Sequence, residues 1–107
     1  MLSNINRVWN NDATNDLVDI LIGLRDKTEM KKFVRDVMTE KEIIEISYRL
    51  QAAKMLANGA KYTDIAEKTK LSSRTIARIS DWMKQGCGGY AVAINNNHDH
   101  ILPASAE

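Results

Sequence analysis

The sequence has little of what cross-links a chain or turns it sharply. Its 107 residues include one cysteine, Cys87, one proline, Pro103, and five glycines. A single cysteine excludes an internal disulfide and is typical of a reducing compartment, so we expect a cytoplasmic protein. The scarcity of proline and glycine disfavours a β fold rich in turns and favours helices.

Long apolar runs are also missing. None reaches the roughly 18 residues that a membrane-spanning helix needs, so we expect no association with a membrane. Hydrophobic residues make up 44% of the chain and charged residues 27%, which is ordinary for a globular protein. A chain of this length suits one domain with a modest core, and self-association would add buried surface.

The net charge is only +1, which by itself gives no reason to expect an acidic partner. The charge is nevertheless uneven, because residues 59–85 hold more cations than anions. The six cations are Lys61, Lys68, Lys70, Arg74, Arg78 and Lys84, and the three anions are Asp64, Glu67 and Asp81. This local excess permits binding to nucleic acid.

The predicted organisation has three parts. Apolar residues recur at helical spacing through residues 13–94, where we expect a single helical domain. Residues 1–12 are predicted to be a flexible N-terminal arm. Residues 95–107 are predicted to be a flexible tail, poorly ordered past its first residue.

Capping signals place the first three helices. The first is predicted to begin near Thr14 or Asn15, either of which can cap it, and the second to begin with Thr28 as its cap. Residues 39–42 read Thr-Glu-Lys-Glu, a capping box that starts a third helix of about 18 residues. Gly59 stands where that helix is expected to end, in the left-handed conformation.

Residues 62–85 predict a helix-turn-helix. A fourth helix over 62–69 and a fifth from Ser72 or Ser73 to about Gln85 are joined by a brief turn. The positions that such a pair must bury are filled by Ile65, Ala66, Leu71, Ile76 and Ile79. Lys70 stands where the turn often carries glycine, so we expect a less favourable backbone there or a slightly different turn.

The polar face of the fifth helix carries groups that suit DNA. Free amides at a helix N-terminus bind phosphate, hydroxyls bind phosphate or base edges, and arginine bonds guanine in the major groove. The predicted DNA-binding residues are Lys61, Tyr62, Thr63, Ser72, Ser73, Arg74, Thr75, Ala77, Arg78 and Lys84. An equally open interpretation of these residues is the solvated face of an ordinary helical bundle.

Several motifs in order give the sequence a family resemblance. They are residues 38–42, 49–50, 55–59, 62–66 and 74–79, followed by Gly88-Gly89-Tyr90. Together they resemble the Trp-repressor family, and within it the YerC/YecD branch, over about residues 14–94. The resemblance implies an all-α fold of about six helices in an intertwined homodimer. It also implies a sequence-specific regulator of transcription, specifically a repressor, that binds double-stranded DNA.

The same resemblance bears on a ligand. Two arginines of the family's tryptophan pocket correspond to Arg49 and Arg78. The next position is glycine in the tryptophan-binding repressor and Ile79 here, while Trp82 replaces a small polar residue one turn later. We expect these side chains to narrow the pocket, so L-tryptophan is not expected as corepressor and no cofactor is predicted. Arg49 and Arg78 then serve phosphate contacts or salt bridges between subunits.

Other chemistry is weakly signalled. His98 and His100 are too few to predict a metal site, and nothing near Cys87 predicts a reactive thiol. No nucleophile–base pair or phosphate-binding loop is recognisable, so we expect no enzyme. Two alternatives remain, a protein-interaction module that uses the same helix pair and a nucleic-acid-binding domain of a replication type.

Overall fold

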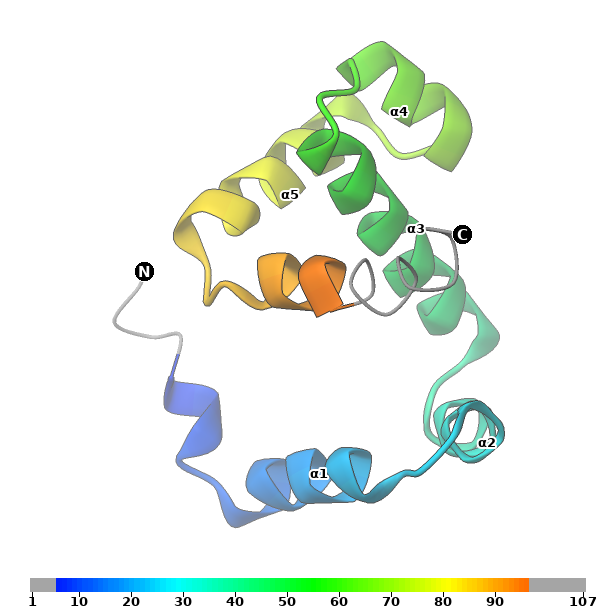
Figure 1. Ribbon diagram of the computed structural model, residues 1–107, viewed down its shortest axis with the longest axis vertical. Helices are drawn as coiled ribbons and strands as arrows, with labels where there is room; N and C mark the ends of the chain where they lie inside the picture. The colour runs from blue at the N-terminus through cyan, green and yellow to red at the C-terminus, as the bar shows by residue number, and fades with distance from the viewer. Residues whose placement is uncertain (1–5, 97–107) are drawn as a thin grey trace, which may run out of the picture. The chain divides into compact units, whose positions relative to one another are not determined.

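The computed structural model describes residues 6–96, and every regular element in that range is helical (Figure 1). In chain order they are the 3-10 helix η2 (Arg7–Trp9) and the α-helices α1 (Asp12–Gly23), α2 (Lys27–Val37), α3 (Glu40–Ala57), α4 (Tyr62–Thr69) and α5 (Ser73–Gln85). Residues 89–96 are also helical. The absence of strands from residues 6–96 confirms the predicted all-α fold class.

Contacts between Cα atoms divide the chain into two compact units, with the boundary inside α3. They are an N-terminal unit, Met1–Ile46, and a C-terminal unit, Ser47–Glu107. The boundary falls within the range that the sequence predicts to be one domain. The segment predicted to be a flexible arm carries η2 and the first residue of α1. The predicted tail lies outside the described residues, except for its first two, which are helical.

The start of α1 is fixed by a side chain that the sequence analysis did not choose. Asn11 is the N-cap, and its Oδ1 accepts hydrogen bonds from the amides of Ala13 (2.7 Å) and Thr14 (3.4 Å). The prediction that Thr14 or Asn15 caps this helix was therefore wrong. Both residues lie within its first turn. The Thr14 hydroxyl donates to the Val8 carbonyl at 2.6 Å, and the side-chain amide of Asn15 donates to the Trp9 carbonyl at 2.8 Å, both in η2. These two bonds tie η2 to α1.

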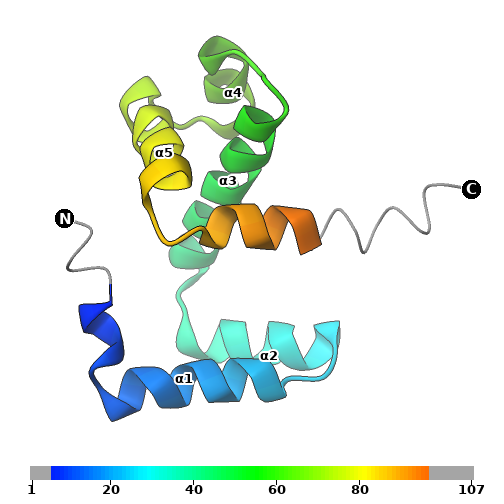
Figure 2. The same cartoon turned by 60° about the vertical axis from the view of Figure 1, so that its left-hand side comes forward.

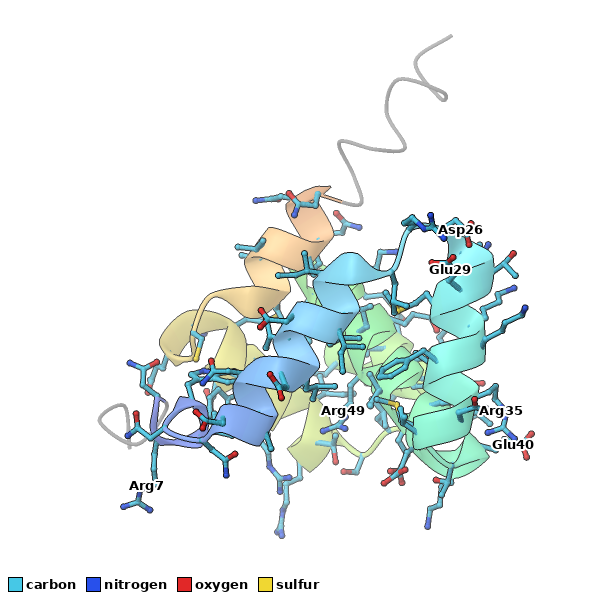
Figure 3. The ribbon with its side chains drawn as sticks, turned by 90° about the horizontal axis from the view of Figure 1, so that it is seen from below. Arg7, Asp26, Glu29, Arg35, Glu40 and Arg49 are labelled. Atoms are coloured by element: carbon cyan, nitrogen blue, oxygen red, sulfur yellow. The ribbon has the colours of Figure 1, made fainter. Side chains whose placement is uncertain are left out.

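The start of α2 differs from prediction in the same way. Asp26, not Thr28, is the N-cap, and its Oδ1 accepts from the amide of Glu29 at 2.9 Å. The Glu29 carboxylate accepts from the amide and the guanidinium of Arg25, both at 3.0 Å, and these bonds hold the pKa of Glu29 below its usual value. Asp26 and Glu29 lie together at the beginning of the helix (Figure 3). Thr28 lies inside the first turn, two positions after the N-cap.

Both ends of α3 are as predicted. The Thr39 amide donates to the carboxylate of Glu42 at 2.9 Å, and the Glu42 amide donates to the Thr39 hydroxyl at 3.1 Å, which is the expected capping box. The helix has the predicted 18 residues. It is followed by Gly59 in the left-handed conformation, with φ of +82°, whose amide donates to the Leu56 carbonyl at 3.0 Å.

The described part of the N-terminal unit, residues 6–46, contains no buried side chain. Large apolar residues on α1 and α2 are instead open to water in the single chain. Ile22 is 76% exposed, Val37 is 56% exposed and Ile20 is 50% exposed. Local hydrogen bonds at the caps therefore define these helices, while much of their apolar surface remains exposed.

The corrected cap of α2 makes a prediction about stability. We expect Asp26→Ala to lower the free energy of unfolding by about 1 kcal/mol, because the Glu29 amide loses its acceptor. Thr28→Ala, a change of similar size two residues along the same turn, is expected to stay within about 0.5 kcal/mol of the native protein. Urea unfolding followed by circular dichroism measures both. A larger loss in Thr28→Ala than in Asp26→Ala would restore the original assignment of the cap.

Candidate nucleic-acid interface

The buried side chains of residues 6–96 all lie in the C-terminal unit. The apolar ones come from three helices and are Ala52 and Ala53 on α3, Ile65 on α4, and Ile76 and Ile79 on α5, none more than 3% exposed. Both ribbon views place α4 and the start of α5 beside the C-terminal end of α3 (Figures 1 and 2). The two small alanines leave room for the isoleucines of α4 and α5. The sequence prediction of Ile65, Ile76 and Ile79 as core residues is confirmed.

The helix-turn-helix has the bounds that the sequence predicts. Residues 70–72 connect the end of α4 to the start of α5. Ser72 is the N-cap of α5, and its hydroxyl accepts from the Thr75 amide at 3.1 Å. The same hydroxyl donates to the Thr75 hydroxyl at 3.1 Å. These bonds fix the first turn of α5, which with its cap holds four of the ten predicted DNA-binding residues.

Two residues determine the path of the turn. Lys70 adopts the left-handed conformation, with φ of +64°, which is the first of the two predicted alternatives, and its amide donates to the Ala66 carbonyl at 2.8 Å. Thr69, which is 1% exposed, donates its hydroxyl to the Ile65 carbonyl at 2.7 Å and accepts from the Leu71 amide at 3.3 Å. Sequence analysis missed Thr69. A hydroxyl residue at the last position of a helix, directly before a turn, is the signal that could have identified it.

Most of the ten predicted DNA-binding residues are exposed on this helix pair. Those at the start of α4 and of α5 and the later cations are open to water: Lys61, Tyr62, Thr63, Ser72, Ser73, Arg74, Arg78 and Lys84. Thr75 and Ala77 are half-buried. The structure therefore brings all ten onto two consecutive helices that contact each other, with the buried isoleucines on the opposite face of α5.

The residues that correspond to the family's tryptophan pocket do not share one environment. Arg49 on α3 and Arg78 on α5 are exposed, and Arg49 is labelled in Figure 3. Ile79 is 3% exposed and belongs to the core, beside Ala52 and Ala53 in the same cluster. Its side chain is therefore accounted for by core packing, and Ile79 does not have to occupy a ligand slot.

An open, mostly apolar groove lies near the end of α5, and sequence analysis did not find it. Its volume is about 370 Å³, and its lining residues are Leu50, Trp82, Cys87, Gly89, Tyr90 and Ala93. Trp82 is 41% exposed. A Cβ atom added at Gly86 would lie 2.6 Å from Cε3 of the Trp82 ring, so only glycine fits beneath the indole. Contacts between segments far apart in the sequence form this groove, and periodicity within one helix cannot reveal them.

The described part of the chain contains neither a metal-binding cluster nor a membrane-spanning helix. Within residues 6–96, no group of three or more histidine, cysteine, aspartate or glutamate residues is placed to hold a metal ion. His98 and His100 lie outside the described residues. No helix in the same range is both long and apolar enough to cross a membrane.

Comparisons with known proteins agree with this geometry. The model of the family described as Trp repressor protein matches residues 12–98. The uncharacterized protein YerC of Bacillus subtilis (strain 168) is 32% identical over 79 residues, which are 74% of this chain and 76% of YerC.

Two solved structures are similar to this chain. The first is a TrpR-like protein from Eubacterium eligens, with a TM-score of 0.82 and 34% identity, covering 87% of this chain and 96% of that one. The second, described as a candidate Trp repressor from Staphylococcus aureus, has a TM-score of 0.80 and 28% identity, covering 87% and 93%.

The buried hydroxyl of Thr69 generates a prediction. Thr69→Val keeps the shape of the side chain but removes the acceptor of the Leu71 amide, so we expect a loss of about 1–3 kcal/mol in the free energy of unfolding. Thr63→Val makes the same chemical change at an exposed position of α4 and is expected to cost less than about 0.5 kcal/mol. Equal losses in the two variants, measured by urea unfolding, would contradict the role given to the Thr69 hydroxyl.

Proposed function

Because this chain belongs to the Trp repressor family, we propose that it is a sequence-specific DNA-binding regulator, acts as a repressor, and reads the major groove with α5. The observation that carries the proposal is the division of α5 into two faces. Ile76 and Ile79 are buried, while Arg74 and Arg78 are exposed on the other side of the same turns. An α-helix fits the major groove, and arginine discriminates guanine there.

The roles of the remaining residues follow from their places. Ser72 and Ser73 lie at the N-terminus of α5, where free amides and the helix dipole favour a phosphate. Lys61 at the start of α4 and Lys84 near the end of α5 are exposed cations suited to phosphates on either side. Arg74 in the first turn is the residue best placed to reach a base edge.

The proposed regulator is a homodimer. The family resemblance implies an intertwined dimer, and the uncovered apolar residues of α1 and α2 supply surface for it to bury. The apolar groove beside Trp82 supplies more. A two-fold dimer presents two copies of α5 to half-sites about one turn of DNA apart, so a palindromic operator is expected.

A specific observation also bears on the alternative of a protein-interaction module, because the groove at Leu50, Trp82 and Tyr90 is an exposed apolar surface. Within the proposed dimer the same surface is available to the second copy, whereas the exposed arginines of α5 suit an anionic partner. DNA binding therefore accounts for more of the molecule.

Replacement of Arg74 tests the reading face. Binding-site selection from a random duplex pool first identifies the preferred sequence. Arg74→Ala is then expected to weaken binding to that sequence by about 1–3 kcal/mol and to relax preference at one position in each half-site. Fluorescence anisotropy with the selected duplex and with single-base variants measures both quantities.

Two control variants make that result specific. Lys84→Ala is expected to weaken all duplexes alike, because a phosphate contact carries no sequence information. Lys54→Ala removes an exposed cation from α3, outside the proposed interface, and is expected to leave affinity unchanged. If Arg74→Ala binds the selected and the variant duplexes as the native protein does, the assignment of α5 as the reading helix is wrong.

We also propose that DNA binding is independent of L-tryptophan. The indole of Trp82, which lies against Gly86 and replaces a small polar residue of the family, supports a pocket narrowed by the protein's own side chain. Isothermal titration with L-tryptophan is expected to give no saturable heat, and operator affinity is expected to be equal with and without it. Saturable heat at micromolar affinity that is lost in Arg78→Ala would contradict this proposal and indicate a working ligand pocket.

A further inference from the structure

Lys70 has an unusual backbone for its residue type. Among residues 6–96 it is the only residue other than glycine with a positive φ, +64°. In this conformation the Cβ atom of an L-residue is crowded by the backbone, whereas glycine adopts it without that strain. A strained residue of this kind persists only when the surrounding structure imposes it, and it is a reason to look for function.

The structure imposes this conformation from both sides. The Lys70 amide donates to the Ala66 carbonyl at the end of α4. The buried Thr69 hydroxyl binds both the Ile65 carbonyl and the Leu71 amide. The direction in which the Lys70 side chain leaves the turn is therefore fixed by the packing of the helix-turn-helix, with little freedom for the backbone to relax.

Nothing in the described part of the chain uses the side chain of Lys70. The residue is exposed, and its ammonium makes no hydrogen bond or ion pair within residues 6–96. A cation close to the end of α4 has a favourable interaction with the helix dipole, but this interaction is weak at an exposed site. Glycine at the same position would relieve the backbone strain. The turn itself therefore gives no reason for a lysine at position 70.

We propose that Lys70 binds a DNA phosphate from the helix-turn-helix turn. The inference rests on the proposed function and adds a residue that the predicted interface did not include. Lys70 precedes the N-cap of α5 by two residues, so its Cα lies within about 7 Å of the start of the reading helix. An ammonium on a flexible stem suits a phosphate, which needs a point charge and no particular approach. The rigid turn holds this cation beside the helix that enters the groove.

The Lys70→Gly variant tests this proposal, because it is expected to raise the stability of the protein while it lowers the affinity for DNA. Relief of the left-handed backbone is expected to raise Tm by about 4–8 °C. Each chain of the proposed homodimer loses one phosphate contact, so the complex with one duplex loses two. Binding is expected to weaken about 25–100-fold near 0.1 M salt, and the slope of log K against log salt is expected to become shallower by about 1.8. The probe is a fluorescein-labelled duplex of mixed sequence, titrated by anisotropy at several salt concentrations.

Control variants separate the effect of the lost charge from the effect of the changed backbone. Lys70→Arg keeps the cation and is expected to keep the native salt slope. Lys54→Ala removes a cation from α3 and is expected to change neither affinity nor slope. A Lys70→Gly protein that is more stable but has the native slope would overturn the phosphate contact, and a less stable one would show that the lysine serves the turn itself.

Failure of this inference is distinguishable from failure of the proposed function. If the native protein binds no duplex at low salt, both are wrong. If it binds with a steep salt slope that Lys70→Gly does not change, DNA binding stands and only the role of Lys70 is lost.

Discussion

The arrangement of the C-terminal unit depends on one packing constraint: α4 and α5 have to bury their isoleucines against two alanines of α3. Ile65, Ile76 and Ile79 form the buried cluster with Ala52 and Ala53, and larger side chains on α3 would leave no room for them. Because Ile76 and Ile79 lie one turn apart, burying them fixes the rotation of α5 about its own axis. The exposed arginines are thereby held on the opposite face, so the small core determines which surface of the helix is offered to a partner.

The features that could be predicted from the sequence are those determined by residues close together in the chain. The bounds of α4 and α5, the capping box at Thr39 and the left-handed Gly59 and Lys70 all depend on residues within one or two turns of each other. The caps of α1 and α2 were misplaced because several residues able to cap stand within four positions. Choosing between Asp26 and Thr28 requires the backbone angles, which propensity alone does not supply.

The contacts that could not be predicted join distant segments. The groove lined by Leu50, Trp82 and Tyr90 brings α3, α5 and residues 89–96 together, and no periodicity within one helix encodes it. Thr69 is a different case, because its hydrogen bonds to Ile65 and Leu71 are local and its place at the end of α4 was a usable signal. The polar face of α5 was identified more easily, because the same 3.6-residue period that places the isoleucines inside places the arginines outside.

The two units differ in the interactions that stabilise them. The C-terminal unit has a small buried core, whereas the described residues of the N-terminal unit are defined by exposed hydrogen bonds at helix ends and leave Ile22 and Val37 open to water. Exposed capping bonds contribute little stability compared with buried apolar surface. A second copy that covers these faces would supply what the single chain lacks, and it would also set the distance between two reading helices. Dimerisation would therefore both cover these apolar residues and place the two copies of α5 for the proposed DNA recognition.

Molecular mass in solution tests the proposed dimer most directly, measured by sedimentation equilibrium for the free protein at micromolar concentration and for its complex with the selected duplex. A dimer that binds DNA gives a free species of twice the 12.1 kDa chain mass and a complex of two chains on one duplex. A stable 12.1 kDa monomer that binds the duplex as a single chain would contradict it.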